Sequence, residues 1–141
     1  MDPRITIVTL GVNDVAAATQ FYESVFGWAR TSASQEGITF FQLNGFLLAL
    51  FKEEELAKDA HVPAQRDGFR GVSLAHNLRS EQEVDGLFRD LEAKGVTILK
   101  KPEKVFWGGY SGYFADIDNH LWEVAYNPYL PLDQAGNVTG Q

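Results

Sequence analysis

The chain alternates between two hydrophobic periods, and this alternation predicts its secondary structure. Residues 5–12 form a β-branched run typical of a strand, and apolar residues between Val15 and Phe26 recur at helical spacing. Asn13-Asp14 offers an N-cap before that helix, and Gly27 can end it. Three short strand-like runs separated by turn residues follow, at residues 28–33, 38–43 and 46–51. The predicted order is β, α, β, β, β.

The same order begins again after a charged connector at residues 52–69, whose EEELAKD segment has helical character. A strand is predicted at residues 72–77. Ser80 can cap a helix running to Lys94, with Glu83 completing a capping box and Gly95 ending the helix. The remaining strands are predicted at residues 96–99, 112–115 and 121–126.

The two halves can be aligned with each other, which indicates an internal duplication. VTLGVND (residues 8–14) aligns with VSLAHNL (72–78), and NGFLLALF (44–51) aligns with DNHLWEVA (118–125). Because half-domains of this size cannot bury separate large cores, we expect an α+β domain in which two tandem βαβββ modules form a shared, curved, eight-stranded sheet around a cleft. The modules are placed at residues 5–52 and 70–128, with the connector at 53–69. A C-terminal tail at 129–141 is expected to pack against the domain and to fray at its end.

Composition narrows the classes of partner and compartment. The net charge of −7, with basic residues scattered among carboxylates, argues against nucleic acid. The chain has no Cys, which excludes disulfides, thiolate metal sites and thiol nucleophiles. The longest apolar run, residues 45–51, is too short to span a membrane, and the acidic start lacks the features of a signal peptide. A cytoplasmic protein is expected.

Two motifs at the expected places resemble the vicinal oxygen chelate superfamily. They are the opening VTLGVND, followed after six intervening residues by FYESVFGW, and the closing YFADIDNHLWEVAYNP. The resemblance covers about residues 5–128, and the superfamily includes glyoxalase I, extradiol dioxygenases, and the bleomycin- and fosfomycin-resistance proteins. It implies the paired-module fold, a small-molecule cleft and a homodimer. It does not name a reaction, because members of one fold include enzymes and pure binders.

The resemblance also implies four metal-ligand positions, on the first and last strand of each module. In this chain those positions align with Ile7, Ala49, Gly71 and Glu123. Only Glu123 carries a donor atom, and a single carboxylate cannot hold a transition-metal ion, because such sites need three or four convergent donors. The sequence therefore predicts no metal and no cofactor.

The three histidines offer no replacement ligands. His120 is expected in a hairpin turn on the opposite face from Glu123, His76 on a helix-facing position, and His61 in the connector. They are interpreted as solvated or capping side chains. The segment Asp116 to Asn119 resembles half of a calcium loop but lacks the distal Gly and Glu, so a turn is predicted there.

Strand alternation then predicts a mostly apolar binding surface with few polar groups. Glu123 is the one candidate catalytic residue, either a desolvated general base or a carboxylate satisfied by its neighbours. The segment Phe106 to Tyr110 is either an aromatic edge that stacks on a ligand or a glycine bulge. The candidate ligand-binding residues are Thr9, Ala49, Phe51, Ser73, Trp107, Tyr110, Phe114 and Glu123.

Three functions follow from this pattern. The leading interpretation is a metal-free protein, similar to the resistance proteins, that binds a small apolar or aromatic molecule. The second is a lyase, isomerase or dioxygenase-type enzyme that uses Glu123 as a base or metal ligands that the alignment misses. The third is a ligand-free structural dimerisation domain whose cleft is filled by its own aromatic side chains.

Overall fold

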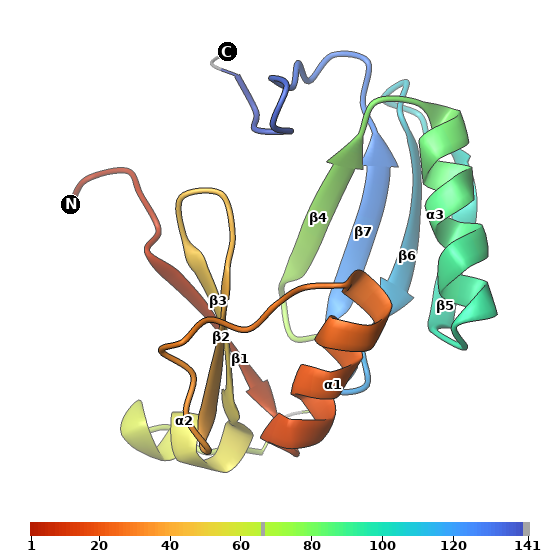
Figure 1. The fold of residues 1–141 in the computed structure, drawn as a ribbon. Coiled ribbons are helices and arrows are strands. Elements are labelled where there is room, and N and C mark those ends of the chain that lie inside the picture. The colour runs from red at the N-terminus through yellow and green to blue at the C-terminus, as the bar shows by residue number, and fades with distance from the viewer. Residues whose placement is uncertain (66, 140–141) are drawn as a thin grey trace. The chain divides into compact units, whose positions relative to one another are not determined.

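A computed structural model describes residues 1–65 and 67–139 of the 141-residue chain. The chain forms two compact units, Met1–Arg70 and Gly71–Gln141 (Figure 1). Each unit has its own sheet with a helix packed on it, so the chain is an α+β protein. None of the helices in the described part of the chain is long and apolar enough to cross a bilayer.

The first unit contains a three-stranded mixed sheet in the order β1-β3-β2. Strand β1 runs parallel to β3, and β2 runs antiparallel to β3. A short helix, predicted from the charged connector, follows β3 directly. The elements are β1 (Ile7–Val12), α1 (Val15–Phe26), β2 (Ile38–Gln42), β3 (Leu47–Lys52) and α2 (Glu53–Asp59).

Helix α1 begins and ends at the residues that the sequence indicates. The Asp14 side chain accepts a hydrogen bond from the backbone N–H of Ala17 at 3.0 Å, which satisfies one of the free donors of the first turn. Gly27 ends the helix in the left-handed conformation at φ 71°, where a side chain would be strained. Both predicted caps of this helix are confirmed.

The strand predicted at residues 28–33 is wrong, and the described strands number seven instead of eight. Only Arg30 forms a bridge to the sheet, opposite Phe41. The Ser34 hydroxyl accepts the backbone N–H of Phe40 at 2.9 Å, which replaces a ladder hydrogen bond with a side-chain one. Ser and Thr side chains compete with strand pairing in this way, and the segment that follows Arg30 is rich in them.

The second unit repeats the topology with all four strands formed. Its sheet has the order β4-β7-β6-β5, with β4 parallel to β7 and the other neighbours antiparallel. Strand β5 extends well past its predicted end, with irregular register on either side of Lys100. The elements are β4 (Ser73–Leu78), α3 (Glu81–Ala93), β5 (Thr97–Lys104), β6 (Tyr110–Ala115) and β7 (Leu121–Tyr126).

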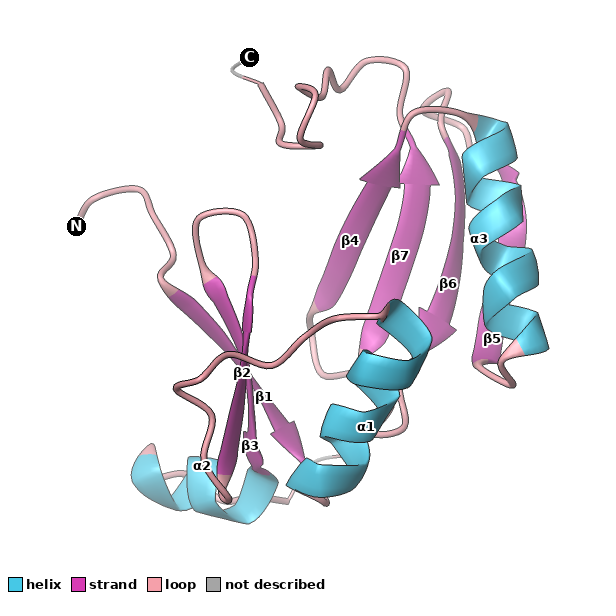
Figure 2. Cartoon of the chain, viewed as in Figure 1, coloured by secondary structure: helices cyan, strands magenta, loops and turns pink. Residues whose placement is uncertain are grey.

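Helix α3 lies along one face of this second sheet (Figure 2). The Ser80 hydroxyl caps it by accepting the backbone N–H of Glu83 at 3.1 Å, as predicted. The reciprocal half of the capping box is shifted by one residue, because the Glu83 carboxylate accepts the backbone N–H of Arg79 at 2.7 Å. Residues Val84, Phe88 and Leu91 form its buried stripe.

Each sheet buries the face that its long helix covers. In the first unit, Tyr22 of α1 is fully buried and packs its ring against Phe41 of β2. In the second unit, Phe88 of α3 packs edge-on against Phe114. The Phe114 ring in turn stacks on Trp122, with 6.3 Å between the two ring centroids. Burial of these rings is the main stabilising contribution of each unit, and it leaves the opposite face of each sheet free of its long helix.

The turn between β6 and β7 corrects the expectation for one histidine. His120 is only 7% exposed, and its Nδ1 lies 2.7 Å from Asp116 Oδ2. Asp116 Oδ1 also accepts the backbone N–H groups of Asp118 and His120. Asn119 adopts φ 64°, a conformation that Asn tolerates better than most residues. The predicted turn is confirmed, but His120 is a buried, paired side chain and not a solvated one.

Arg79 holds part of the tail against the second unit. The Arg79 guanidinium donates to the backbone carbonyls of Leu132 and Asp133. The Asp133 carboxylate in turn accepts hydrogen bonds from the Asn137 side-chain amide and from the backbone N–H groups of Asn137 and Ala135, and these bonds lower the pKa of Asp133. The fraying predicted for the very end of the tail falls on residues 140–141, which lie outside the described residues.

Candidate functional site

The open face of the first sheet, opposite α1, is almost entirely apolar. Thr9 is paired with Ala49 in the β1–β3 register, and paired residues point to the same face. Phe51 lies two residues beyond Ala49 and therefore shares this face. Ala49 is fully buried, whereas Thr9 is exposed and Phe51 is half-buried. Three predicted ligand-binding residues thus lie together on one surface.

The open face of the second sheet combines apolar and charged groups. Ser73 is paired with Leu121, and Ala75 is paired with Glu123, so these residues share a face. Glu123 is half-buried between two buried residues, Trp122 and Val124, which point to the α3 side. Ser73 and Glu123 therefore share one face of the second sheet, two register positions apart.

Tyr113 is a site residue that the sequence analysis missed. It lies directly opposite Glu123 in the β6–β7 register and opposite Lys100 in the β5–β6 register. Burial raises the pKa of Tyr113, and the charge of Glu123 and a hydrogen bond to it raise that pKa further, while Lys100 lowers it. The alternation of side chains along a strand could have identified Tyr113. Neighbouring residues in a strand point to opposite faces, so only one of Tyr113 and Phe114 can share the face of Glu123.

Two other candidates, Tyr110 and Phe114, lie on the opposite face of the second sheet, against α3. Phe114 is 2% exposed and packs in the core between Phe88 and Trp122. The Tyr110 hydroxyl donates a hydrogen bond to Asp85 of α3 at 2.5 Å. This bond, together with burial and nearby carboxylates, raises the pKa of Tyr110 to about 12. Both side chains bind the helix to the sheet.

Trp107 occupies a tight turn between β5 and β6. The backbone N–H of Val105 donates to the carbonyl of Gly109, which closes the turn. A Cβ atom added at Gly109 would lie 1.8 Å from the Trp107 ring, so the ring lies directly over this glycine. Gly108 has φ 93° and is covered by the Tyr129 ring. Because glycine has no side chain, Gly108 and Gly109 allow the Tyr129 and Trp107 rings to pack directly against the backbone.

The positions that the resemblance assigns to a metal ion do not fit one. Ile7 lies on the open face of the first sheet near Ala49, and neither side chain has a donor atom. Gly71 precedes β4, and Glu123 is the one carboxylate of the set. Among the described residues, no three His, Asp or Glu side chains gather as metal ligands would. A divalent ion needs a convergent set of donors, which these four positions do not supply.

Comparisons with known proteins agree with this fold. The family model of the Glyoxalase/Bleomycin resistance protein/Dioxygenase superfamily matches residues 4–124. The crystal structure of a glyoxalase-related enzyme from Fulvimarina pelagi is 39% identical, with a TM-score of 0.86 over 98% of both chains.

Curated relatives are more distant. The fosfomycin resistance protein FosX of Listeria monocytogenes is 28% identical over 83% of this chain and 84% of its own length. The anthracycline biosynthesis protein DauV of Streptomyces sp. strain C5 is 28% identical over 82% of this chain. This chain spans less than half of DauV, covering 44% of its length. The repeated topology and these matches together show that the chain belongs to the Glyoxalase/Bleomycin resistance protein/Dioxygenase superfamily.

Proposed function

We propose that this protein binds a small aromatic or apolar molecule on the open face of its second sheet, without a metal ion. The carboxylate of Glu123 accepts a hydrogen bond from a hydroxyl or amine of the ligand. The apolar side chains around it, including Leu121, contact the ligand's ring. Ser73 offers a second polar contact on the same face.

The observation that supports this function is the pairing of Tyr113 with Glu123 across β6 and β7. A tyrosine beside the carboxylate holds it in a fixed orientation and leaves the remaining carboxylate acceptors for a ligand. Because the surroundings are partly buried, a hydrogen bond to this charged group is stronger than one in water. A ligand that lacks a donor gains only the contact with the apolar surface.

The relatives support binding without naming the ligand. FosX is named as a resistance protein and DauV as a biosynthesis protein, both in connection with small organic compounds. The apolar open face of the first sheet, with Thr9, Ala49 and Phe51, offers further surface of the same chemistry.

A matched pair of ligands tests the proposal. We would measure binding of 2-naphthol and of 2-methoxynaphthalene, which keeps the ring and loses the donor, by saturation-transfer NMR and thermal shift. The account expects 2-naphthol to bind more tightly, and Glu123→Gln to weaken it by roughly tenfold, since a hydrogen bond to a charged group contributes about 1.5–3 kcal/mol. If both ligands bind the native protein equally well, and Glu123→Gln binds them as the native protein does, Glu123 does not contact the ligand. A wider aromatic library that produces no stabilisation would favour a structural domain.

A second candidate is an enzyme in which Glu123 acts as a general base. The 39% identical structure is named as a glyoxalase-related enzyme, and the Glu123 side chain is partly exposed. Its signature is turnover of a substrate with an acidic C–H bond that Glu123→Gln abolishes while binding persists. Loss of binding and turnover together would indicate an anchoring role.

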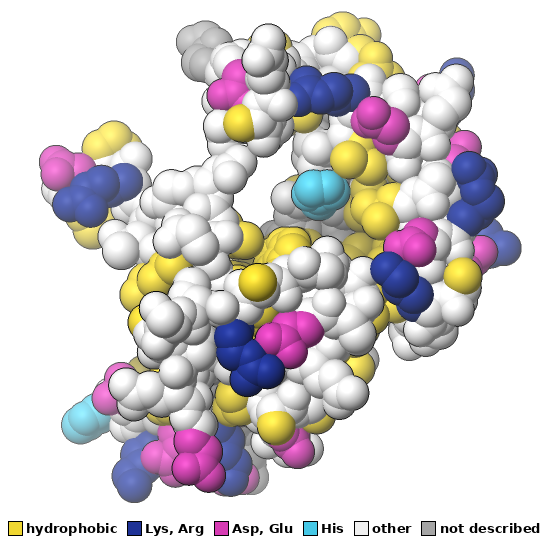
Figure 3. Space-filling model, in the orientation of Figure 1, with side chains coloured by type: hydrophobic (Ala, Val, Ile, Leu, Met, Phe, Trp, Pro, Cys, Tyr) yellow, Lys and Arg dark blue, Asp and Glu magenta, His cyan; other side chains and the backbone are white. Residues whose placement is uncertain are grey.

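We also infer that the protein works as a homodimer in the cytoplasm. The inference is supported by the paired arrangement common in the superfamily and by the absence of Cys from the sequence. Light scattering during size-exclusion chromatography tests the first point, and cell fractionation tests the second. Nucleic acid remains an unexpected partner, and on the face drawn in Figure 3 basic side chains lie interspersed with acidic ones.

A further inference from the structure

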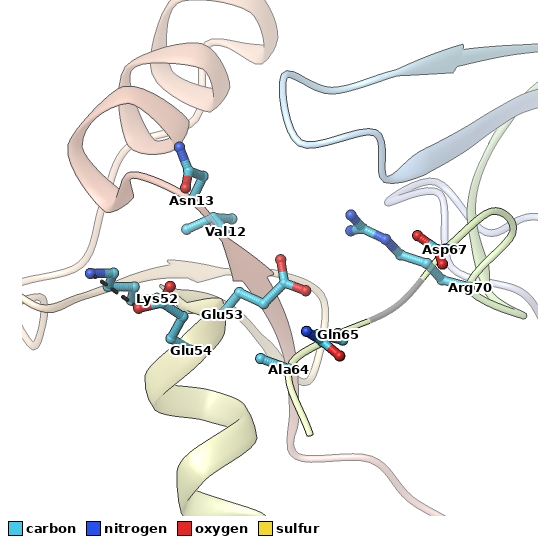
Figure 4. A pocket seen from close by; sticks show the side chains of 9 residues that line it. All are labelled: Val12, Asn13, Lys52, Glu53, Glu54, Ala64, Gln65, Asp67 and Arg70. Atoms are coloured by element: carbon cyan, nitrogen blue, oxygen red, sulfur yellow. Dashed lines mark ion pairs between the residues drawn. The ribbon is translucent and has the colours of Figure 1, made fainter. Parts of the chain in front are cut away.

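The open face of the second sheet carries a row of charged and polar side chains that the first sheet lacks. In the second sheet, Glu123 of β7, Tyr113 of β6 and Lys100 of β5 are paired in turn across neighbouring strands. Paired residues point to the same face, so this row lies on the open face. In the first unit, charged side chains such as Lys52 and Glu54 lie at the end of β3, around a cavity where α2 begins (Figure 4).

An irregularity in β5 brings Lys100 to this face. Ile98 pairs with Phe114, and Lys100 pairs with the next residue of β6, Tyr113, so Leu99 is an extra residue on β5. With regular pairing, Leu99 would lie opposite Tyr113, and Lys100 would point to the α3 side. Bulges of this kind redirect side chains and occur often beside binding sites.

A second irregularity places Glu103 on the same face. After Lys100, the next paired residue of β5 is Glu103, opposite Ser111, so the two residues between them oppose Gly112 alone. A Cβ atom at Gly112 would lie 2.7 Å from the Lys100 carbonyl oxygen and 2.9 Å from the backbone nitrogen of Pro102. The glycine therefore allows the irregular part of β5 to approach β6 closely.

Lys100 interacts with both of its neighbours on this face. Burial and Glu123 raise the pKa of Tyr113, whereas the charge of Lys100 lowers it. Lys100 Nζ also lies 3.2 Å from Glu103 Oε1, with the Glu103 side chain 63% exposed. Such an exposed ion pair contributes little energy, and an ammonium group has three donors. Lys100 can therefore bind a further acceptor.

We propose that Lys100 determines the ligand specificity of this face by binding the carboxylate of an aromatic hydroxy acid. The inference rests on the proposed function, in which Glu123 accepts a hydrogen bond from the hydroxyl of the ligand. Because neighbouring strands lie about 4.8 Å apart, the backbones of β7 and β5 are separated by about 10 Å at this row. A fused aromatic ring with its hydroxyl and carboxylate at opposite ends spans the two side chains, with the ring over Tyr113. Repulsion by Glu123 directs the ligand's carboxylate towards Lys100.

Three naphthalene derivatives test the proposal by isothermal titration calorimetry of the full chain at neutral pH. They are 2-naphthol, 6-hydroxy-2-naphthoate, which carries its two groups at opposite ends, and 3-hydroxy-2-naphthoate, which carries them side by side. We expect 6-hydroxy-2-naphthoate to bind about five- to tenfold more tightly than 2-naphthol, since it adds a charged hydrogen bond at a partly exposed lysine. No gain is expected for 3-hydroxy-2-naphthoate, because its groups cannot reach both side chains.

Matched variants assign the gain to Lys100. Lys100→Met keeps most of the apolar stem and removes the charge, so it should abolish the gain and leave the affinity for 2-naphthol unchanged. Lys104→Met is the control, because Lys104 lies on the same strand and pairs with Tyr110 on the α3 side. Glu103→Gln removes a competing carboxylate and should tighten the binding of 6-hydroxy-2-naphthoate further. Circular dichroism checks folding, and Lys100→Gln serves as the second variant if Lys100→Met does not fold.

The outcomes separate this inference from the proposed function. If 2-naphthol binds through Glu123 and the added carboxylate gives no gain, Lys100 does not contact the ligand and the proposed function stands. The same conclusion follows if a folded Lys100 variant without the charge keeps the gain. If none of the three compounds binds, both the inference and the proposed function are overturned.

Discussion

In the first unit, the last strand carries Ala49 at the position where the last strand of the second unit carries Glu123. The residues around these two positions share the same register, with a parallel first strand on one side and an antiparallel strand on the other. Across the strand, Ala49 faces Phe40 in the first unit, whereas Glu123 faces Tyr113 in the second. The duplicated modules thus keep their backbone order and differ in the chemistry of their open faces.

The helix-facing sides differ in a second way. Thr39 of the first unit pairs with Leu50 of the last strand, as Gly112 of the second unit pairs with Val124. The Thr39 hydroxyl lies 2.8 Å from the hydroxyl of Thr19 on α1, so a hydrogen bond joins helix to sheet there. At Gly112 the Phe88 ring of α3 fills the space of a side chain. The first unit therefore joins its helix to its sheet here through a hydrogen bond, whereas the second unit does so through an aromatic ring packed on a glycine.

The largest expected effect separates the two faces of the sheets. Phe114→Ala removes a ring that is 2% exposed, so it should lower the free energy of unfolding by about 3–5 kcal/mol. Phe51→Ala, on the half-buried open face of the first sheet, should cost clearly less. Urea denaturation measures both changes. Equal losses would mean that the open face is packed as tightly as the helix-facing core.

A smaller effect is expected at the glycine beneath α3. A Cβ atom at Gly112 would lie 2.7 Å from both the Lys100 carbonyl oxygen and Phe88 Cζ, so Gly112→Ala should destabilise by about 1–3 kcal/mol through overpacking. Gly86→Ala, inside α3 where an added Cβ would meet only Arg89 Nη2 at 3.8 Å, should instead stabilise by about 0.5–1 kcal/mol through helix propensity. Thermal unfolding distinguishes the two signs. A neutral Gly112→Ala would show that Phe88 does not hold α3 this close.

The hydrogen bond between Thr19 and Thr39 in the first unit is expected to contribute less to the free energy of unfolding than the packing at Gly112. Thr39→Val keeps the shape and removes the hydroxyl that Thr19 contacts, so it should cost about 1 kcal/mol. Thr19 keeps its bond to the backbone carbonyl of Val15, which limits the loss. Serial urea curves of Thr39→Val, Thr19→Val and the double variant give the coupling energy between the two residues. Additive losses would contradict a direct interaction.

The smallest effect concerns pH. Since the pKa of Tyr110 is about 12 in the folded chain, above its ordinary value of 10.0, the neutral phenol is favoured by folding. Its stabilising contribution is complete below pH 10 and is lost as the pH rises through 12. Asp85→Asn removes the main cause and should shift the Tyr110 pKa back towards 10. NMR titration of tyrosine labelled at Cζ follows this shift, with Tyr110→Phe assigning the signal.

Much of the fold was predictable because local chemistry determines it. Asp14, Gly27 and Ser80 set helix ends through hydrogen bonds and backbone conformation that depend on a few neighbouring residues. The segment after Trp28 was not predictable, because its strand was lost to competition from Ser34, which depends on where Phe40 lies in the fold.

The site was predictable only where strand parity applied. The alternation of side chains along strands predicted that Thr9, Ala49 and Glu123 lie on open faces, where the structure has them. Phe114 was predicted as a ligand contact, but its neighbour Tyr113 shares the face of Glu123, so Phe114 points to the other face.

Elemental analysis tests the central claim, that the metal positions of this superfamily have lost their function in this chain. The protein would be produced without a metal-binding tag, in medium supplied with Mn, Fe, Ni and Zn, and measured by inductively coupled plasma mass spectrometry after exhaustive buffer exchange. With Ile7, Ala49 and Gly71 at three of the four positions, the account predicts only trace, sub-stoichiometric metal. Stoichiometric metal that disappears in Glu123→Gln would contradict it.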